Sequence, residues 1–300
     1  MYDIIIVGAG PAGLTAAIYA GRANKKVLVL EALTYGGQII NTNVIDNYPV
    51  NPGISGVEFA TKIYEQAKAL GAEIKFEKVV DIKDGNPKEV VTNKETYQTK
   101  TIILATGSDS RKLKLENEDK LLGRGISYCA TCDGAFYKNK DVAVVGGGIT
   151  ALKDALYLSD ITNKVYLIHR RDTFKTEEDV VDKVKEKDNI EIIYNSNVTK
   201  LIADDTLKEI EVTDNEKNVI NIKVDALFIA VGRIPENQNF AKLINLDSNG
   251  YIISDEKCHT NIEGIFVAGD NRVKGLRQLV TATSDGAIAA TEAIRYINNK

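Results

Sequence analysis

The pattern of apolar and polar residues along the 300-residue chain predicts an α/β protein. Residues 3–7 form a short, nearly continuous apolar run, which is typical of a strand buried on both faces of a parallel sheet. A helix rich in small residues is predicted from Leu14 to about Arg22, and a second strand from Lys26 to Leu30. This succession of strand, helix and strand predicts a βαβ unit.

The same pattern returns later in the chain as a loose internal repeat. Residues 141–168 again contain an apolar strand, a helix and a second strand. At a common offset of 138 residues, Gly8 aligns with Gly146 and Gly13 with Ala151. Two glycine-rich turns, each between a buried strand and a helix, are far more specific for dinucleotide binding than one isolated motif.

The glycines of the two turns, residues 8–13 and 146–151, are expected to have separate physical roles. The first makes a tight turn, the second lets a pyrophosphate approach the backbone, and the third allows close contact between helix and strand. The phosphates would bind the free N–H groups at the start of the helix. Pro11 lies near that start, where its missing N–H costs little.

The two repeats differ at the end of their second strand. Glu31 ends the first, where a carboxylate can accept hydrogen bonds from a ribose diol. His169, Arg170 and Arg171 stand at the matching place in the second, and such donors suit a 2′-phosphate. We therefore expect an unphosphorylated adenosine ribose in the first unit and NADP in the second, the alternative being that the two arginines are solvated surface charge.

Further apolar strands indicate that the second domain is inserted into the first. Residues 102–107 and 227–232 form matching strands that end in glycine, and residues 264–270 form another that no longer belongs to the second repeat. The chain would cross between domains near 111–115 and near 239–244, and two crossings could act as a hinge. The predicted architecture is two Rossmann-like dinucleotide-binding domains, the first formed by residues 1–112 and 243–300 and the second by residues 113–242.

Composition narrows the function classes. A net charge of -4 gives no indication of nucleic-acid or anionic-membrane binding, and no apolar stretch is long enough to span a bilayer. The first strand begins at Asp3, which leaves no room for a signal peptide, and the chain has three cysteines. We therefore expect a cytoplasmic protein rather than a secreted disulfide scaffold.

Cys129 and Cys132 are the main candidates for chemistry. A Cys-x-x-Cys pair can close a small redox disulfide, and a structural zinc site or a structural disulfide is the competing interpretation. Zinc would need two more ligands, and the chain offers only Cys258 and two histidines. Asp133 could protonate a leaving thiolate, or could simply be a turn residue before Gly134.

The assembled pattern resembles the low-molecular-weight thioredoxin reductases over essentially the whole chain. The order and spacing of the matching stretches carry this resemblance: Gly8–Gly13, Gly36-Gly37-Gln38, Asn47-Tyr48-Pro49, Ala105-Thr106-Gly107, Cys129–Gly134, Gly146–Ala151, His169-Arg170-Arg171, Gly269-Asp270, Arg277-Gln278, Thr281-Ala282 and Asp285-Gly286-Ala287.

The resemblance implies a homodimer with FAD in the discontinuous domain and NADPH in the inserted one. It implies that Cys132 is the sulfur next to the flavin, that Cys129 attacks the disulfide of thioredoxin or a similar small protein, and that Asp133 is the acid. It also favours rotation of the inserted domain during turnover. The implied FAD residues are Gly8, Gly10, Pro11, Ala12, Gly13, Glu31, Gly37, Gln38, Asn47, Thr106, Gly107, Gly269, Asp270, Arg277 and Gln278, and the implied NADPH residues are Gly146, Gly148, Ile149, Thr150, Ala151, His169, Arg170, Arg171 and Lys175.

The departures from the family pattern lie in the NADPH domain. Ile149 stands where a small polar or acidic residue is usual, Lys153-Asp154 where two Glu are usual, and Lys175 where Arg is usual. Lys keeps the charge but lacks the bidentate fork of Arg. Other hypotheses therefore stay open: reduced ferredoxin as electron donor, a flavin-dependent dithiol oxidase, or a non-catalytic nucleotide-binding redox sensor.

Overall fold

A computed structural model describes residues 1–174 and 176–300. The chain forms two compact units. The first consists of Met1–Asp109 with Ile234–Lys300, and the second of Ser110–Arg233. The segments that join them include two short paired strands, β7 (Ser108–Ser110) and β16 (Arg233–Pro235).

The first unit is built on a seven-stranded sheet of order β3-β2-β1-β6-β5-β4, with β17 also pairing with β6. β1, β2, β3, β6 and β17 run parallel, whereas β5 pairs antiparallel with both β4 and β6. The strands are β1 (Tyr2–Val7), β2 (Val27–Glu31), β3 (Glu73–Phe76), β4 (Val79–Lys83), β5 (Lys88–Thr92), β6 (Thr96–Leu104) and β17 (Ile265–Val267).

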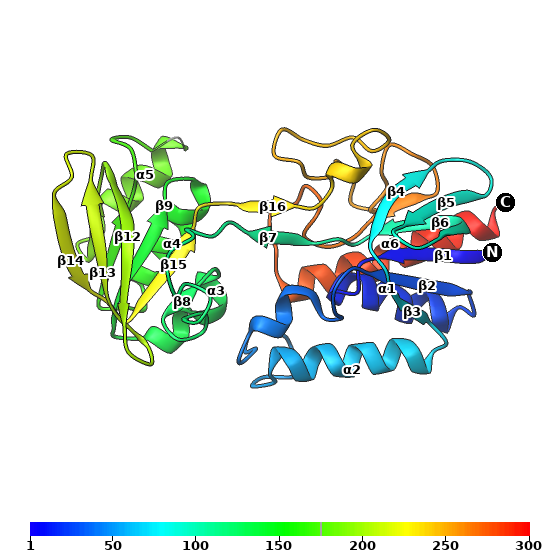
Figure 1. Ribbon diagram of the computed structural model, residues 1–300, viewed down its shortest axis with the longest axis horizontal. Helices are drawn as coiled ribbons and strands as arrows, with labels where there is room; N and C mark the ends of the chain where they lie inside the picture. The colour runs from blue at the N-terminus through cyan, green and yellow to red at the C-terminus, as the bar shows by residue number, and fades with distance from the viewer. Residues whose placement is uncertain (175) are drawn as a thin grey trace. The chain divides into compact units, whose positions relative to one another are not determined.

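Helices cover one face of this sheet (Figure 1). They are α1 (Pro11–Arg22), α2 (Gly56–Ala69) and α6 (Leu279–Asn298), together with the short helix η1 (Gly37–Asn41). The short helix η3 (Gln238–Phe240) packs on the opposite face through Phe240. Alternate residues of β1 serve the two faces, since Ile4 and Ile6 pack under the helices and Ile5 and Val7 pack on the other side. Each fully buried side chain of this size stabilises the fold by about 1.5–3 kcal/mol.

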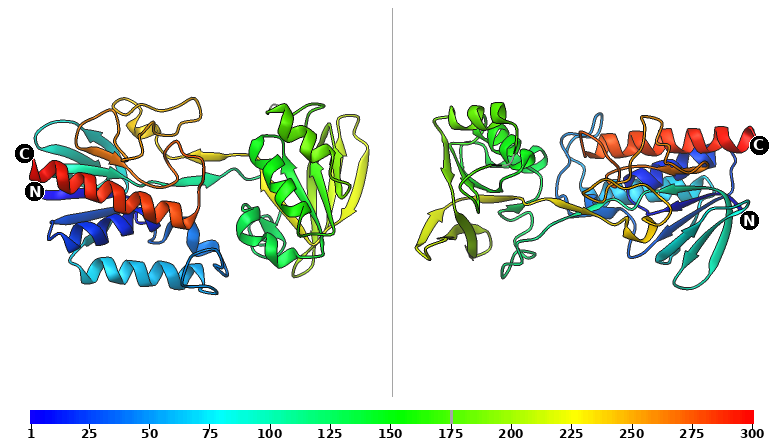
Figure 2. Two further views of the ribbon diagram at one scale, coloured as in Figure 1. Left: turned by 180° about the vertical axis from the view of Figure 1, so that it is seen from behind. Right: turned by 90° about the horizontal axis from the view of Figure 1, so that it is seen from above.

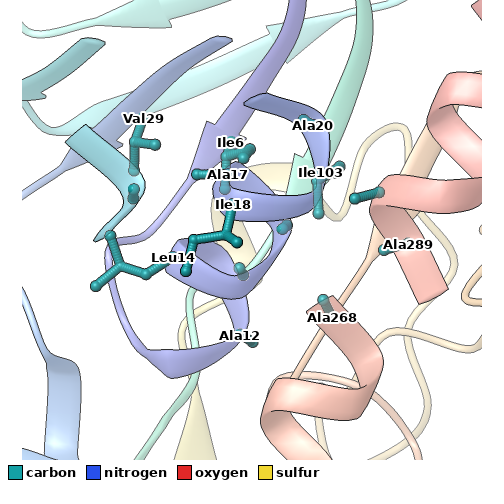
Figure 3. Packing of buried hydrophobic residues seen from close by; sticks show 14 of the residues in the cluster. Ile6, Ala12, Leu14, Ala17, Ile18, Ala20, Val29, Ile103, Ala268 and Ala289 are labelled. Carbon is teal, nitrogen blue, oxygen red and sulfur yellow. The ribbon is translucent and has the colours of Figure 1, made fainter. Parts of the chain in front are cut away.

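The small residues of α1 allow close packing. Figure 3 shows Leu14 and Ile18 of α1 over Ile6 of β1, with Ala289 of α6 nearby. At Gly286 of α6, an added Cβ would lie 2.2 Å from the carbonyl oxygen of Ala12, so only glycine permits this approach. Two further views show both chain termini at one end of this unit (Figure 2).

The second unit repeats the plan with a five-stranded parallel sheet of order β11-β10-β9-β15-β8. Its helices and its antiparallel sheet β12-β13-β14 cover opposite faces. The elements are β8 (Ile126–Ser127), α3 (Ala130–Asp133), η2 (Gly134–Tyr137), β9 (Asp141–Gly146), α4 (Ile149–Ser159), β10 (Lys164–Ile168), α5 (Glu178–Lys185), β11 (Ile190–Ile193), β12 (Ser196–Ala203), β13 (Leu207–Asp214), β14 (Val219–Lys223) and β15 (Ala226–Ala230).

The predicted α/β class with two Rossmann-like folds is confirmed. In each unit the first strand of the repeat lies between its partner strand and a later strand, so that the chain order reverses beside it: β1 lies between β2 and β6, and β9 between β10 and β15. Ligands of such sheets bind outside the carboxyl ends of the strands at this point. Both glycine-rich turns leave their sheets there.

Candidate functional site

The first glycine-rich turn leaves a cradle for a phosphate. Gly8 has φ +109°, and an added Cβ would lie 2.3 Å from the carbonyl oxygen of Ala105. A Cβ on Gly13 would lie 2.0 Å from the carbonyl oxygen of Gly8, whereas one on Gly10 would meet nothing within 4 Å. The outer glycines are therefore fixed by packing, and the open space at Gly10 fits a pyrophosphate at the start of α1.

Glu31 is held at the end of β2 by its own neighbours. Its Oε2 accepts a hydrogen bond of 2.8 Å from the N–H of Ala9, and its Oε1 accepts one of 3.0 Å from the N–H of Leu33. A cavity of about 340 Å³ opens beside it. Such a cavity is in the size range of small-ligand sites, and its lining includes Gly8, Glu31, Ala32, Lys78, Val79, Thr106 and Asn239.

Segments far apart in the sequence meet around this turn. A Cβ on Gly37, whose φ is +61°, would lie 3.3 Å from the Cα of Gly10. Asn47 donates a 3.0 Å hydrogen bond from Nδ2 to Oε1 of Gln278. Gln38 donates one of 2.6 Å to Oδ1 of Asp109. These contacts bring together predicted FAD residues from four segments of the chain, those that contain Gly10, Gly37 with Gln38, Asn47 and Gln278.

The loop that carries Gly269 and Asp270 is anchored by a buried ion cluster. The carboxylate of Asp285, in α6, accepts hydrogen bonds from Nε and Nη2 of Arg272 at 2.8 and 2.9 Å and from Nζ of Lys274 at 2.7 Å. It also accepts one of 3.0 Å from the N–H of Gly269. Burial raises the pKa of Asp285, but the hydrogen bonds from Arg272 and Lys274 outweigh it and leave that pKa lowered.

Arg277 makes further contacts that hold the same loop. Its guanidinium lies 4.0 Å from the centre of the Tyr251 ring and donates to the carbonyl oxygens of Asp270 and Arg272, at 3.3 and 3.1 Å. The loop is thus shaped by protein contacts around the predicted FAD residues.

The second glycine-rich turn differs from the first in the side chains that pack against it. Gly148 is exposed, and a Cβ there would meet nothing within 4 Å. The His169 ring packs directly against Gly147, where a Cβ would lie 1.9 Å from it. Ala151 takes the place of the third glycine and is fully buried in α4. Ile149 and Thr150 are exposed beside the open position.

The three residues at the end of β10 divide into one buried and two exposed side chains. His169 is 7% exposed, stacks on Phe174 with a ring-centre distance of 4.8 Å, and its Nε2 lies 3.0 Å from the carbonyl oxygen of Thr173. Arg170 and Arg171 are exposed and fit an anionic ligand. The predicted residue Lys175 lies outside the described residues.

Cys129 and Cys132 form a disulfide, with their Cα atoms 5.3 Å apart. The short helix α3 begins after Cys129, whose carbonyl oxygen accepts hydrogen bonds from the N–H groups of Cys132 and Asp133, at 3.2 and 3.1 Å. Both cysteines are half-buried.

Asp133 is half-buried beside this disulfide, and burial raises its pKa above the usual range for a carboxyl group. Its Oδ2 accepts a 2.6 Å hydrogen bond from Oγ of Ser127. Ser127 lies at the end of β8 and is a polar residue of this site that motif reasoning missed.

The third cysteine is separate from this chemistry. Cys258 is fully buried in the first unit, and burial raises the pKa of its thiol to about 12. His259 is partly exposed and pairs through Nδ1 with Oδ2 of Asp255 at 2.9 Å. Within residues 1–174 and 176–300, no group of three or more His, Cys, Asp and Glu side chains could hold a metal ion.

The structure therefore places the described FAD candidates in the first unit, and the disulfide and the described NADPH candidates in the second. Among the helices in the described part of the chain, none has both the length and the apolar composition that a membrane span requires.

Comparison with known proteins places the chain among redox flavoproteins. The family model described as pyridine nucleotide-disulphide oxidoreductase matches residues 2–286. The chain is 41% identical to the thioredoxin reductase of Listeria innocua, over 99% of this chain and 94% of that protein. It is 42% identical to the thioredoxin reductase of Mycoplasma genitalium, over 96% and 93%. The crystal structure of thioredoxin reductase from Streptococcus pyogenes superposes with a TM-score of 0.96 at 39% identity, covering 100% of this chain and 99% of that one. The chain belongs to the pyridine nucleotide-disulphide oxidoreductase family.

Proposed function

We propose that this protein is a thioredoxin reductase, which carries electrons from NADPH through FAD and the Cys129–Cys132 disulfide to the disulfide of thioredoxin or a similar small protein. The observation that carries the proposal is the half-buried disulfide next to an acid of raised pKa, in the same unit as a second nucleotide turn. The full-length similarity to two thioredoxin reductases supports it.

FAD would bind in the first unit. The open Gly10 turn would take its pyrophosphate, and Glu31 would take the ribose diol by exchanging its present backbone partners or sharing them. Gln38, Asn47, Asp270, Arg277 and Gln278 would hold the rest of the cofactor. When bound, FAD supplies the two-electron transfer between nicotinamide and disulfide.

NADPH would bind in the second unit. The start of α4 at Gly148 would take the pyrophosphate, and Arg170 and Arg171 would pair with the 2′-phosphate. Because His169 is buried against Gly147, it would shape the turn, with the two arginines as the principal donors.

The partner step uses the two cysteines in sequence. Once the disulfide has taken up two electrons, the thiolate of Cys129 attacks one sulfur of the partner's disulfide and releases the other as a thiolate. Cys132 then attacks the mixed disulfide, which restores the Cys129–Cys132 bond and leaves the partner as a dithiol. Asp133 supplies a proton to a sulfur that becomes a thiolate when the disulfide is reduced.

The biological setting belongs to the same proposal. We infer that the protein acts as a homodimer, because the resemblance to the thioredoxin reductases implies one. We also infer that it acts in the cytoplasm, because the small number of cysteines suits a reducing compartment.

The decisive experiment is an anaerobic titration of the purified yellow protein with NADPH, NADH or reduced ferredoxin, followed by thioredoxin and a chromogenic disulfide. NADPH should bleach the flavin, and thioredoxin should restore its colour. Cys132→Ser should keep bleaching but lower thioredoxin reduction by roughly 10³-fold or more. Cys258→Ala, which removes the buried third thiol, is the matched control and should leave turnover unchanged.

Three results would overturn parts of this function. If reduced ferredoxin bleaches the flavin and NADPH does not, ferredoxin rather than NADPH is the electron donor. Turnover that requires oxygen and consumes a dithiol would indicate an oxidase. Full thioredoxin reduction by Cys132→Ser would refute the disulfide mechanism.

A further inference from the structure

Ser127 connects the two parts of the redox site. It lies at the end of the edge strand β8 and is 1% exposed. Its Oγ lies 2.6 Å from Oδ2 of Asp133 and accepts a 3.0 Å hydrogen bond from the N–H of Cys129. The carbonyl oxygen of Cys129 lies farther away, at 3.3 Å. Because a hydroxyl has one proton to give, the short contact assigns that proton to Asp133.

The reduction of the disulfide requires protons at this place. Breaking the S–S bond takes up two electrons, which the proposed function supplies, and leaves two sulfurs that bind two protons in the dithiol. One proton would come from Asp133 and the other from solvent. Asp133 then carries a negative charge in a half-buried site, where an unpartnered carboxylate is costly.

We propose that Ser127 is a positioning residue for this step, whose hydroxyl stabilises the ionised Asp133 carboxylate and fixes it relative to the backbone of Cys129. This inference rests on the proposed role of Asp133 as the acid. Burial raises the pKa of Asp133, and the hydrogen bond from Ser127 opposes that rise. Ser127 therefore keeps the acid able both to release its proton and to take one up again.

Other groups around Asp133 titrate and must be separated from it. Burial and the charge of Asp133 raise the pKa of Tyr137, in η2, and Asp225 adds to this, so that Tyr137 stays neutral near pH 7. Helix α4 packs against α3 and carries Lys153 and Asp154. Burial raises the pKa of Asp154 to about 6, with Arg233 opposing the rise. Measurements in an Asp154→Asn background remove this competing titration.

The test measures the midpoint potential of the Cys129–Cys132 disulfide in the FAD-loaded protein between pH 5 and pH 9. The protein is equilibrated with mixtures of reduced and oxidised dithiothreitol, and free thiols are trapped with a maleimide. The slope of potential against pH should change where Asp133 titrates, and Asp133→Asn should remove that change. Ser127→Ala should move the pH at which the slope changes upward by about one unit, because the Asp133 carboxylate loses its hydrogen-bond donor.

Matched variants separate positioning from general stability. Ser127→Thr keeps the hydroxyl, so its profile should stay close to that of the wild type. Ser159→Ala removes another buried serine hydroxyl of the second unit, one that donates to the carbonyl oxygen of Leu156 at 2.7 Å, and should leave the profile unchanged. If Ser127→Ala does not fold, Ser127→Val matches Ser127→Thr in volume but lacks the hydroxyl, and it should shift the profile in the same direction.

The inference is overturned if the slope of potential against pH does not change in the wild type. It is also overturned if Ser127→Ala leaves the pH of that change where it is, or if Ser159→Ala moves it as far as Ser127→Ala does. Since dithiothreitol replaces both NADPH and the partner, this result does not depend on either. Loss of NADPH-driven turnover in the wild type would refute the proposed function alone.

Discussion

The two βαβ repeats follow one plan but hold their glycine-rich turns differently. In the first, Gly13 faces the carbonyl oxygen of Gly8 with no room for a Cβ. In the second, Ala151 occupies the matching position and is fully buried. The first residues of the two turns also differ, with φ +109° at Gly8 and +157° at Gly146. A shared motif therefore does not imply a shared tolerance, since the local backbone decides whether a methyl group fits.

The repeats also differ in charge where a ribose would lie. Glu31 offers a carboxylate that already accepts two backbone hydrogen bonds, whereas Arg170 and Arg171 offer exposed guanidinium groups. An acceptor suits a ribose diol and would repel a phosphate, and the arginines do the reverse. The difference gives a physical reason why the two units would take different nucleotides.

The largest expected effect on activity comes from adding a methyl group at the first glycine-rich turn, because loss of FAD would abolish turnover. Gly13→Ala would place a Cβ 2.0 Å from the carbonyl oxygen of Gly8, which forces the helix away from the turn. We expect purification of a colourless protein or at least a 100-fold higher dissociation constant for FAD, on the order of 3 kcal/mol or more. Fluorescence titration of the FAD-free protein measures it. Retention of FAD at wild-type affinity would show that the turn can relax.

The next effect concerns the ion cluster that anchors the Gly269–Asp270 loop. Asp285→Asn leaves Arg272 and Lys274 buried without their counter-charge, so the free energy of unfolding should fall by about 3–5 kcal/mol at pH 7. The pKa of Asp285 is lowered in the folded state, so its contribution is present above the unfolded value, about 3.9, and is lost as pH falls through the folded value. The deficit of the variant should therefore shrink at pH 3.

Urea unfolding of the wild type and the variant at both pH values measures this contribution. Lys62→Ala breaks the exposed Lys62–Glu58 pair on α2 and is the matched control, with an expected change below about 1 kcal/mol. An equal deficit for Asp285→Asn at pH 7 and pH 3 would contradict the role of its charge.

A smaller effect should separate the two ribose sites. Replacing Arg170 and Arg171 by Ala should raise KM for NADPH by roughly 10- to 100-fold and leave KM for NADH nearly unchanged, because only NADPH carries the 2′-phosphate. Steady-state kinetics with both nucleotides tests the prediction, with Arg124→Ala as a control for loss of an exposed arginine in the same unit. A parallel rise for NADH would assign the arginines a structural role.

Sequence reasoning predicted the repeated framework well because buried strands and glycine turns leave local patterns. The predicted strand over residues 3–7 differs from β1 by one residue, and that over residues 26–30 differs from β2 by one residue at each end. The predicted first helix begins at Leu14, whereas α1 begins at Pro11, because the second half of the glycine-rich motif forms the first turn of the helix. Side-chain partners that meet only on folding leave no such pattern.

The pair of Ser127 and Asp133 and the cluster around Asp285 belong to that second class. Ser127 reads as an ordinary strand residue, and its meaning depends on the turn of α3 that brings Asp133 back to it. From the sequence, Arg272 and Lys274 look like surface charges in a loop, yet both side chains are buried and pair with Asp285 of α6. Such contacts depend on tertiary geometry rather than on periodicity, so sequence motifs could locate the site but not its supporting contacts.

The smallest expected effect is the reverse exchange at the second turn. Ala151→Gly would give α4 the glycine of the consensus motif, but the Ala151 Cβ already packs in the buried core of this unit. The variant loses that methyl group and gains backbone freedom in a helix, so we expect a loss of about 1 kcal/mol in stability and less than a two-fold change in KM for NADPH. Thermal unfolding and kinetics measure the two quantities. A marked gain in NADPH affinity would mean that the Ala151 methyl group restricts the second turn, as a methyl group at Gly13 would restrict the first. The contrast between the repeats would then reflect cofactor demand rather than local backbone geometry.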